Sequence, residues 1–403
     1  MSELKPGWRW AKFGDVVQLN KDRCADPVEA GIERYVGLEH IEPDDLRICR
    51  WGSVAGGTTF TNLFRPGQVL FGKRRAYQRK VAVADFIGVC SGDIYVFESK
   101  DPSVLLPDLL PFICQTDGFF DHAVGTSAGS LSPRTNWTQL AQYEFALSPL
   151  DEQRRIAELL SELRKYQEAL RDASSRIDIL RDSLIKTRSL ELVRRFGLRP
   201  LRSVVIGIQS GISPDARAEN ARDDEYGVLK VSAVGDWQFI QSENKAIDDQ
   251  TFLSDLEVKS GDILATRANA DPASVGRTCI VVETRPGLML SDKTWRLQLA
   301  SDDFGKVGIV AWTKSPIFRK YIHAHIGGTE AKNISQVRFL GGPFPACTAS
   351  DFYEFSSEVE SIVMSASSLT SQLERARDLF SLSLNQLLIA NMRQDTLQEL
   401  ASH

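Results

Sequence analysis

One stretch, residues 148–197, constrains the fold more than any other, because apolar residues recur in it at strict seven-residue spacing. Two such rows form the seam along which a helix packs against a partner helix in a coiled coil. The first row holds Ile156, Leu163, Leu170, Ile177 and Leu184. The second row is expected three positions later and holds Leu159, Tyr166, Ala173 and Leu180. A helix of this length would extend about 70 Å, at about 1.5 Å per residue.

Residues 348–394 return to the same period. One row holds Phe352, Val359, Ala366, Leu373, Phe380 and Leu387, and the other holds Phe355, Ile362, Leu369, Ala376 and Ala390. Either helix alone could be an ordinary core helix. Two of them, each preceded by a segment of similar length, predict instead that each is the partner of the other in an antiparallel coiled coil.

The starts and stops of both helices are also predicted. Ser148 is a suitable N-cap and Pro149 suits the first helical position, while Gly197 can adopt the left-handed conformation that ends a helix. Thr348 and Asp351 have the spacing of a capping box at the start of the second helix.

The segments before the two helices are expected to be α+β domains related by an internal repeat. Short β-prone runs at 35–38, 68–71, 80–84 and 93–97 are separated by turn residues, and 105–120 is apolar at helical spacing. RPGQVLF at 65–71 matches KSGDILA at 259–265, and SGDIY at 91–95 matches SDKTW at 291–295. We expect domains at 1–147 and 198–347, a long helix over 148–197, and a second long helix with a C-terminal tail over 348–403. Antiparallel pairing of the helices would make the molecule pseudo-twofold.

Composition and motifs argue against a membrane protein, a metalloprotein and an enzyme. No run is long and apolar enough to span a membrane, and residues 1–10 do not resemble a signal peptide, so a cytoplasmic protein is expected. The six cysteines have no CxxC spacing, which predicts reduced thiols and no metal site. No Walker phosphate loop, Asn/Asp-Pro-Pro-aromatic motif or glycine-rich cofactor loop is present, so we expect no catalytic residues on this chain. Two sets of residues resemble the metal-binding acids and lysine of a nuclease: Asp85 with Glu98 and Lys100, and Asp249 with Glu257 and Lys259. Acids at strand ends often produce such a pattern by chance.

The distribution of charge favours a nucleic-acid partner despite a net charge of -5. Residues 46–84 contain no Asp or Glu but eight Lys or Arg residues, and DNA binding responds to such local clusters. The candidate contacts in the first domain are Lys73, Arg74, Arg75, Tyr77, Gln78, Arg79 and Lys80; those in the second are Arg267, Asn269, Arg277, Lys332 and Asn333. Arg74 or Arg75 is expected to read a base, with Tyr77 packed behind it. A solvated basic hairpin is the alternative for the first set, and Lys332 and Asn333 could equally close the domain onto its helix.

Three phrases together resemble the specificity subunits of Type I restriction-modification systems: LSPLDEQRRIAELL at 147–160, GDIL at 261–264 with Arg267, and GGTEAKNIS at 327–335. The resemblance implies two target recognition domains, each reading half of a split sequence in double-stranded DNA. It implies docking of two modification (methyltransferase) subunits, and through them of restriction subunits. S-adenosylmethionine, ATP and Mg²⁺ would lie on those partners, with no cofactor here. The sequence departs from the family at 67–70, GQVL, and at 348–355, TASDFYEF, which lacks the EQ of the first helix start.

A protein-binding scaffold with two paired domains and no sequence-specific DNA binding is the competing interpretation. Duplex binding that weakens steeply with salt would separate the two, because phosphate contacts release counterions.

Overall fold

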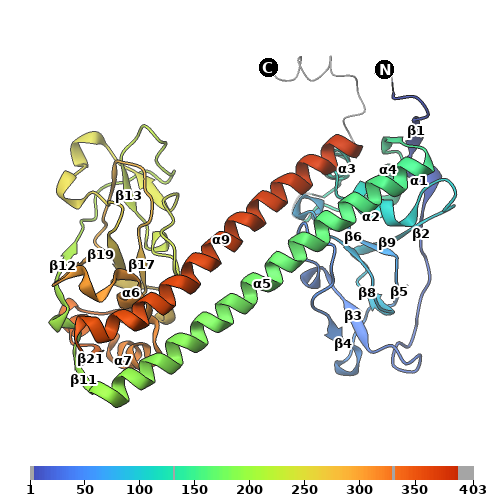
Figure 1. The fold of residues 1–403 in the computed structure, drawn as a ribbon. Helices are drawn as coiled ribbons and strands as arrows, with labels where there is room; N and C mark the ends of the chain where they lie inside the picture. The colour runs from blue at the N-terminus through green and yellow to red at the C-terminus, as the bar shows by residue number, and fades with distance from the viewer. Residues whose placement is uncertain (1–3, 130–131, 329–331, 389–403) are drawn as a thin grey trace. The chain divides into compact units, whose positions relative to one another are not determined.

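The computed structural model describes residues 4–129, 132–328 and 332–388. The chain divides into two compact units, residues 1–171 with 372–403 (unit 1) and residues 172–371 (unit 2). Each unit thus combines one globular domain with segments of both long helices (Figure 1). In the described part of the chain, no helix has the length and apolar character needed to cross a membrane.

The domain of unit 1 contains two four-stranded sheets (Figure 1). One has the order β2-β9-β6-β7 and is antiparallel throughout, and the other has the order β4-β3-β8-β5 with β3 and β8 parallel. The strands are β1 (Arg9–Lys12), β2 (Val17–Leu19), β3 (Arg34–Val36), β4 (Gly52–Ser53), β5 (Asn62–Phe64), β6 (Val69–Gly72), β7 (Val81–Val83), β8 (Gly88–Cys90), β9 (Ile94–Ser99) and β10 (Glu144–Leu147). The helices are α1 (Phe13–Val16), α2 (Leu110–Ile113), α3 (Asp117–Gly125) and α4 (Trp137–Leu140).

The domain of unit 2 repeats the main four-stranded sheet, as the sequence predicts, but its second sheet has three strands rather than four. Its main sheet has the order β12-β19-β15-β17, strand for strand the counterpart of β2-β9-β6-β7. The strands are β11 (Leu198–Pro200), β12 (Val205–Ser210), β13 (Gly227–Leu229), β14 (Asn244–Ala246), β15 (Ile263–Thr266), β16 (Ala268–Asn269), β17 (Thr278–Ile280), β18 (Leu288–Met289), β19 (Thr294–Leu299), β20 (Lys332–Asn333) and β21 (Pro343–Pro345). The helices are α6 (Lys306–Lys314), α7 (Pro316–His325) and α8 (Gln336–Leu340).

One predicted helix of the first domain is wrong. The four predicted strands correspond to β3, β6, β7 and β9, but residues 105–120 form α2 and the start of α3 rather than one helix. The interruption has a local cause: Thr116 has extended backbone angles, and its Oγ1 accepts a hydrogen bond from the Phe119 N–H at 3.3 Å. Thr116 is therefore an N-cap, which begins a new helix and ends the preceding one.

The two long helices, α5 (Leu150–Phe196) and α9 (Ala349–Leu388), run antiparallel wherever they meet within a unit. In unit 1 the side-chain N–H of Gln167 donates to the carbonyl of Ala376 at 2.9 Å, so the first half of α5 lies against the last part of α9. In unit 2 Arg188 donates to both carboxylate oxygens of Glu358, at 2.8 and 3.1 Å, so the end of α5 lies against the start of α9. The α+β class with an antiparallel helix pair is therefore confirmed.

The second row of the predicted seam on α5 is wrong by one position. Leu159, Tyr166 and Leu180 are 48%, 50% and 57% exposed. The buried row lies four residues after the first row and includes Leu160, Gln167 and Arg181. A heptad seam alternates steps of three and four residues, so both positions fit the period. The row at plus three is the more apolar, but at plus four Gln167 donates to the Ala376 carbonyl and Arg181 lies over the ring of Trp237, contacts that the sequence does not reveal.

The other seam positions lie where a seam needs them. Ile156, Leu170, Phe352, Phe355, Val359 and Ala376 are buried, and the other described members of the first α5 row and of both α9 rows are half-buried. That group comprises Leu163, Ile177, Leu184, Ile362, Ala366, Leu369, Leu373, Phe380 and Leu387. Ala390 lies outside the described residues.

The start of α5 differs from the prediction, whereas the end of α5 and the start of α9 agree with it. Helix α5 begins at Leu150, and the carbonyl of Pro149 accepts the Gln153 N–H at 2.9 Å, so Pro149 rather than Ser148 is the residue before the first turn. Gly197 has φ +72°, the left-handed stop. Thr348 Oγ1 accepts the Asp351 N–H at 3.2 Å, and the Asp351 carboxylate accepts the Thr348 N–H at 3.4 Å, which is a capping box.

Gln153 joins the start of α5 to the domain of unit 1. Its buried carboxamide accepts the Leu106 N–H at 2.8 Å and donates to the carbonyls of Val104 at 2.9 Å and Ser148 at 2.8 Å. Three backbone groups therefore have this one side chain as a hydrogen-bond partner. Gln153 also lies in the segment 147–160, which carries part of the family resemblance.

Gln153→Met keeps the length of the side chain but removes all three hydrogen bonds. We expect the free energy of unfolding to fall by about 2–3 kcal/mol, because buried backbone groups left without partners cost about 1–3 kcal/mol. Urea denaturation followed by circular dichroism measures this. Gln139→Met, at an exposed position, is the matched control and should change stability by less than about 0.5 kcal/mol. Equal stability of the two variants would contradict the role of Gln153.

Candidate nucleic-acid interface

The candidate contacts gather on one loop that the repeat places at the same point of each domain. In unit 1 the loop follows β6. The backbone N–H of Lys73 donates to the backbone carbonyl of Asp93, and the Lys73 carbonyl accepts the Thr135 N–H, both at 2.9 Å. In unit 2 the loop follows β15. The backbone N–H of Arg267 donates to the backbone carbonyl of Lys293 at 2.8 Å, and the Arg267 carbonyl accepts the Ile334 N–H at 3.1 Å. Lys73 and Arg267 are thus counterparts.

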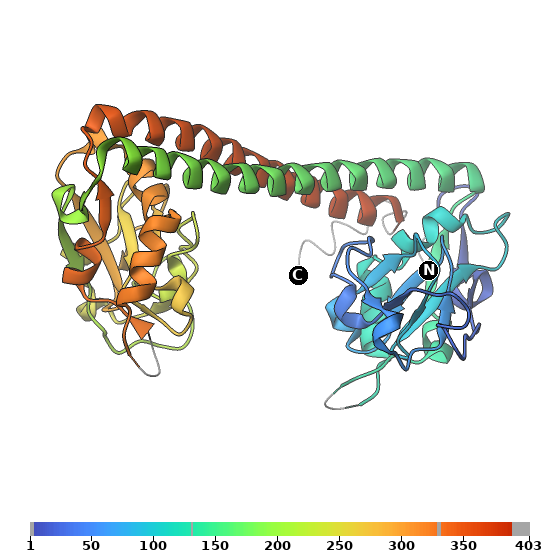
Figure 2. The ribbon, with the colours of Figure 1, turned by 90° about the horizontal axis from the view of Figure 1, so that it is seen from below.

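A hairpin borders each loop. Its arms pair Ala128 with Arg134 in unit 1 and Gly327 with Asn333 in unit 2. In each unit, taken by itself, these arms lie at the end of the domain away from the long-helix segments (Figure 2). The loop and hairpin therefore form an edge that the helices leave uncovered.

Arg74 holds the loop of unit 1 in place. Asp93 accepts hydrogen bonds from Arg74 Nη1 at 3.3 Å and from Arg134 Nε at 2.9 Å, and Arg74 Nε also donates to Ser132 Oγ at 2.5 Å. The Asp93 carboxylate thus ties the loop after β6 to the hairpin. Asp93 and Arg134 were not among the predicted contacts of this edge, although Asp93 lies in SGDIY at 91–95, a motif that repeats.

Lys73 lies beside the same network. Its ammonium group is 4.6 Å from the centre of the Tyr95 ring. Burial lowers the pKa of Lys73, the charges of Arg134 and Arg23 lower it further, and Asp93 opposes them. An anion arriving at this edge would therefore be favoured electrostatically.

Arg75 and Tyr77 are the most available side chains of the loop. Arg75 is exposed, and its guanidinium group makes no hydrogen bond or ion pair within the part of the chain that the structure describes. Its backbone has φ +54° and donates to the Pro133 carbonyl at 2.8 Å, which fixes the direction of the side chain. Tyr77 is 57% exposed, so its predicted packing behind the arginines is wrong: Ala76 takes the inward position. Gln78 is half-buried beside them.

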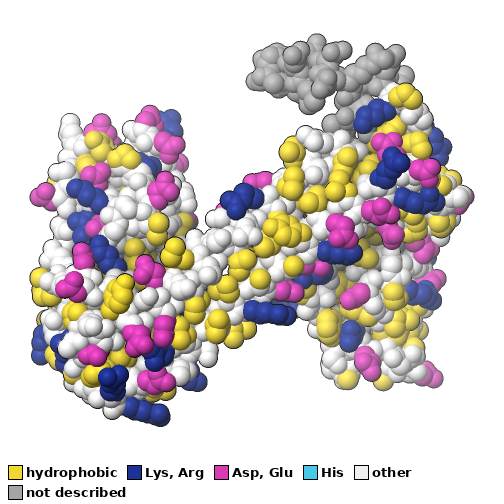
Figure 3. All heavy atoms as spheres, in the orientation of Figure 1, with side chains coloured by type: hydrophobic (Ala, Val, Ile, Leu, Met, Phe, Trp, Pro, Cys, Tyr) yellow, Lys and Arg dark blue, Asp and Glu magenta, His cyan; other side chains and the backbone are white. Residues whose placement is uncertain are grey.

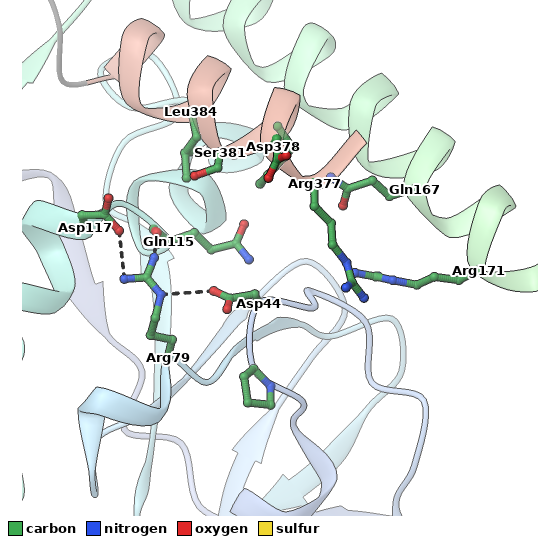
Figure 4. Close-up of a pocket in the computed structure, with 12 residues that line it drawn as sticks. Asp44, Arg79, Gln115, Asp117, Gln167, Arg171, Arg377, Asp378, Ser381 and Leu384 are labelled. Carbon is green, nitrogen blue, oxygen red and sulfur yellow. Dashed lines mark hydrogen bonds and ion pairs between the residues drawn. The ribbon is translucent and has the colours of Figure 1, made fainter. Parts of the chain in front are cut away.

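Arg79 and Lys80, in contrast, have partners inside the domain. Arg79 pairs with Asp44 at 3.1 Å and Asp117 at 3.0 Å, and its Nη2 donates to the Gln115 carbonyl at 2.9 Å (Figure 4). Lys80 Nζ donates to the Leu38 carbonyl at 2.6 Å. These two cations are held by the domain, which leaves Arg75 as the better candidate for DNA contact.

Most other arginines of the acid-free stretch are neutralised in the same way. Arg47 pairs with Asp45, Arg50 with Glu42, and Arg65 with Asp22. All three acids precede residue 46 in the sequence, so the continuous basic segment becomes a mixed surface in the fold.

In unit 2 the exposed cation of the loop is Arg267, which has no hydrogen-bonding or ionic partner for its side chain among residues 4–129, 132–328 and 332–388. Asn269 Oδ1 accepts the Asp271 N–H at 3.0 Å, and Arg277 Nη2 donates to Ser274 Oγ at 2.7 Å. Lys332 Nζ donates to the Gly328 carbonyl at 2.7 Å. Lys332 and Asn333 form β20, which pairs with β16, so they close the loop against the hairpin and lie next to Arg267.

In the first nuclease-like set, Glu98 and Lys100 have hydrogen-bond partners within the domain. Glu98 accepts hydrogen bonds from Gln18 and Gln68, and Lys100 donates to the Gly14 carbonyl. Within the described residues, no group of three or more His, Cys, Asp or Glu side chains is placed to hold a metal ion.

These features define a class: a duplicated α+β domain with two antiparallel helices and one uncovered, cation-bearing loop in each repeat. Similarity to known proteins narrows that class. The chain is 31% identical over 196 residues to the Type I restriction enzyme EcoEI specificity subunit and 26% identical over 192 residues to the EcoDI specificity subunit, both of Escherichia coli. These alignments cover 45% and 46% of this chain but only 32% and 42% of the relatives, so the chain spans less than half the length of either. No protein-family model matches the chain.

Solved structures share the fold over nearly the whole chain. The Type I restriction-modification S subunit from M. genitalium superposes with a TM-score of 0.59 at 11% identity, covering 96% of each chain. A chain from a structure on complex assembly and conformational transition of the type I R-M system superposes with a TM-score of 0.53 at 17% identity, covering 96% of this chain and 98% of that one. The predicted resemblance to Type I specificity subunits is therefore confirmed in sequence and in fold.

Proposed function

We propose that this chain is the non-catalytic DNA-recognition subunit of a Type I restriction-modification complex, active in the cytoplasm, in which each domain reads one half of a bipartite target. The observation that carries the proposal is the repeated loop: the same turn after β6 and after β15 presents an exposed guanidinium group, Arg75 in unit 1 and Arg267 in unit 2. Arginine is the side chain best suited to guanine O6 and N7 in the major groove.

The remaining candidates have supporting roles in this proposal. Lys73, Lys332 and Asn333 would contact backbone phosphates beside the reading arginines, and Tyr77 offers an exposed ring next to Arg75. Arg74 positions the loop through Asp93. Phosphate contacts of this kind set register without reading sequence.

The long helices are the proposed docking surface for two modification subunits, and through them for restriction subunits. Apolar side chains gather on the outside of α5 and α9 (Figure 3). Those exposed are Leu159, Tyr166, Ile179, Leu180, Tyr353, Met364, Leu379 and Leu382. Exposed apolar residues that recur along a helix are typical of protein interfaces. S-adenosylmethionine, ATP and Mg²⁺ would be bound by the partner subunits.

Removing the two exposed arginines should relax specificity in separate half-sites. Arg75→Gly suits the left-handed backbone at that position, and Arg267→Ala removes the exposed guanidinium group from the loop of unit 2. Each should reduce discrimination at one base pair of one half-site by about 1–3 kcal/mol and leave the other half-site unchanged. Competition binding across single-base variants of the target, which is found by methylation profiling of host DNA with and without this chain, measures the effect.

Arg50→Ala is the matched control, because Arg50 lies in the same acid-free stretch but pairs with Glu42. It should change every affinity by less than about twofold. A loss of affinity that is equal for all duplexes in Arg75→Gly and Arg267→Ala, with the salt slope lowered by about one unit in each, would mean that Arg75 and Arg267 contact only phosphate. Duplex binding that does not respond to salt at all would favour the protein-binding scaffold.

A further inference from the structure

A pocket of about 400 Å³ in unit 2 gathers more positive charge than the fold neutralises. It lies where the start of α7 and the loops around residues 237 and 275 meet α5. Its charged lining consists of Lys186, Arg277, Lys314 and Arg319 against Asp182 and Asp236. None of these residues belongs to the exposed edge at Arg267, and only Arg277 was among the DNA-binding candidates.

Arg277 and Arg319 are the unusual pair in this pocket. Both are half-buried, and their recorded partners are neutral: Arg277 donates to Ser274 Oγ at 2.7 Å, and Arg319 donates to the Ala273 carbonyl at 2.8 Å. No carboxylate lies within 4.0 Å of either guanidinium group in the described part of the chain. Burial lowers the pKa of Arg319 and the charge of Arg277 lowers it further, while the charges of Asp236 and Asp271 oppose the decrease. Two neighbouring cations that are partly removed from water without a carboxylate in direct contact are costly.

The third cation, Lys314, is only partly compensated. Its Nζ is 3.0 Å from Asp236 and 4.8 Å from the centre of the Trp237 ring. Burial nevertheless lowers its pKa, with Asp236 opposing and Arg277 contributing to the decrease. The other carboxylate of the lining, Asp182, is 3.4 Å from Arg181 and so is already engaged.

The repeat shows that the fold does not require this cluster. Counted from the N-cap residues Thr116 and Ser315, the counterpart of Lys314 in unit 1 is Gln115, and the counterpart of Arg319 is Phe120. The matching pocket of unit 1 does contain Arg79, but Asp44 and Asp117 neutralise it (Figure 4). The pocket of unit 1 therefore pairs its arginine with carboxylates, whereas the pocket of unit 2 does not pair Arg277 and Arg319 in this way.

We propose that the pocket of unit 2 is an oxyanion site that binds a phosphate group between Arg277, Lys314 and Arg319. Pro316, the first residue of α7, also lines the pocket, so the positive end of a ten-residue helix adds to the attraction. Guanidinium groups suit the geometry of phosphate oxygens, which they bind in pairs. The phosphate can be that of a DNA backbone or of a free phosphorylated molecule; the site itself does not depend on the proposed function.

Titration of the full chain with inorganic phosphate, by calorimetry against chloride at equal ionic strength, tests the site. The parent should bind phosphate saturably. Arg319→Gln and Arg277→Gln should each weaken that binding about tenfold or more, because each removes charge-assisted hydrogen bonds. Lys320→Gln removes the same charge from the next, exposed position of α7 and should stay within about twofold of the parent.

The melting temperature of each variant in chloride distinguishes loss of the site from loss of folding. One arginine variant that folds is enough to test the site. Absence of saturable phosphate binding by the parent, or an equal loss in Lys320→Gln, would overturn the proposal.

A duplex arm identifies the source of the phosphate. If phosphate weakens duplex binding by the parent more than chloride does, and Arg319→Gln removes that difference, the site takes a backbone phosphate. If phosphate binds with unchanged affinity while duplex is bound, it takes a free phosphate group. A chain that binds phosphate but no DNA would contradict the proposed function and leave this site standing.

Discussion

Leu160→Asp should lower the free energy of unfolding of unit 1 by more than about 4 kcal/mol, the largest loss that we expect from a single change in this chain. Leu160 is 0% exposed and packs in the core that α5 shares with the domain of unit 1. Aspartate there would leave an unpaired charge in an apolar core, a mechanism whose cost lies at the upper end for point mutants. Urea denaturation monitored by circular dichroism measures the loss.

The matched control is the neighbouring residue. Leu159→Asp, at a position that is 48% exposed, should change stability by less than about 0.5 kcal/mol. It should also weaken co-purification of a modification subunit if the exposed apolar residues of α5 form the docking surface. A greater loss of stability at Leu159 than at Leu160 would restore the register expected from the sequence.

Phe352→Ala should destabilise unit 2 by about 3–5 kcal/mol, the range for a large aromatic side chain removed from a core. Phe352 is fully buried near the start of α9, with its ring centre 4.8 Å from that of Phe344 and 5.3 Å from that of Phe355. It therefore joins the long helix to strand β21. The measurement is the urea midpoint at a constant denaturant dependence.

Tyr353→Ala removes an aromatic ring of similar size from the next position of α9, where the side chain is exposed. Its stability should stay within about 0.5 kcal/mol of the parent. Comparable losses in the two variants would mean that α9 does not pack against unit 2 through Phe352.

The helices and the domain repeat could be predicted because their signals are local. A seven-residue period and a motif that recurs about 200 residues later need no knowledge of partners. The register of α5 could not be predicted to one residue, because Gln167 and Arg181 read as surface residues. In the fold, Gln167 donates to the Ala376 carbonyl, and Arg181 stacks on the ring of Trp237, 4.7 Å away.

The candidate site shows the same limit. The stretch 46–84 contains no acid, but four aspartates from other parts of the chain form ion pairs with its arginines in the fold. They are Asp22, Asp44, Asp93 and Asp117. Only Arg75 among the predicted cations of that stretch is exposed without a partner in the part of the chain that is described. The pocket proposed as an oxyanion site was not predicted, because Arg277 is far from Lys314 and Arg319 in the sequence and only the fold brings the three side chains together.

The division of the long helices between the units has a consequence for synthesis on the ribosome. Unit 2 is one continuous segment, 172–371, and can fold as soon as it has emerged. The core of unit 1 includes Leu160 but also Leu384 and Leu388, so it stays open at one side until α9 is made. At about 5–20 residues per second, that delay is roughly 10–45 s. A nascent chain thus carries an unfinished apolar groove for that period, which makes its first domain the part that depends most on chaperones and is most exposed to proteolysis.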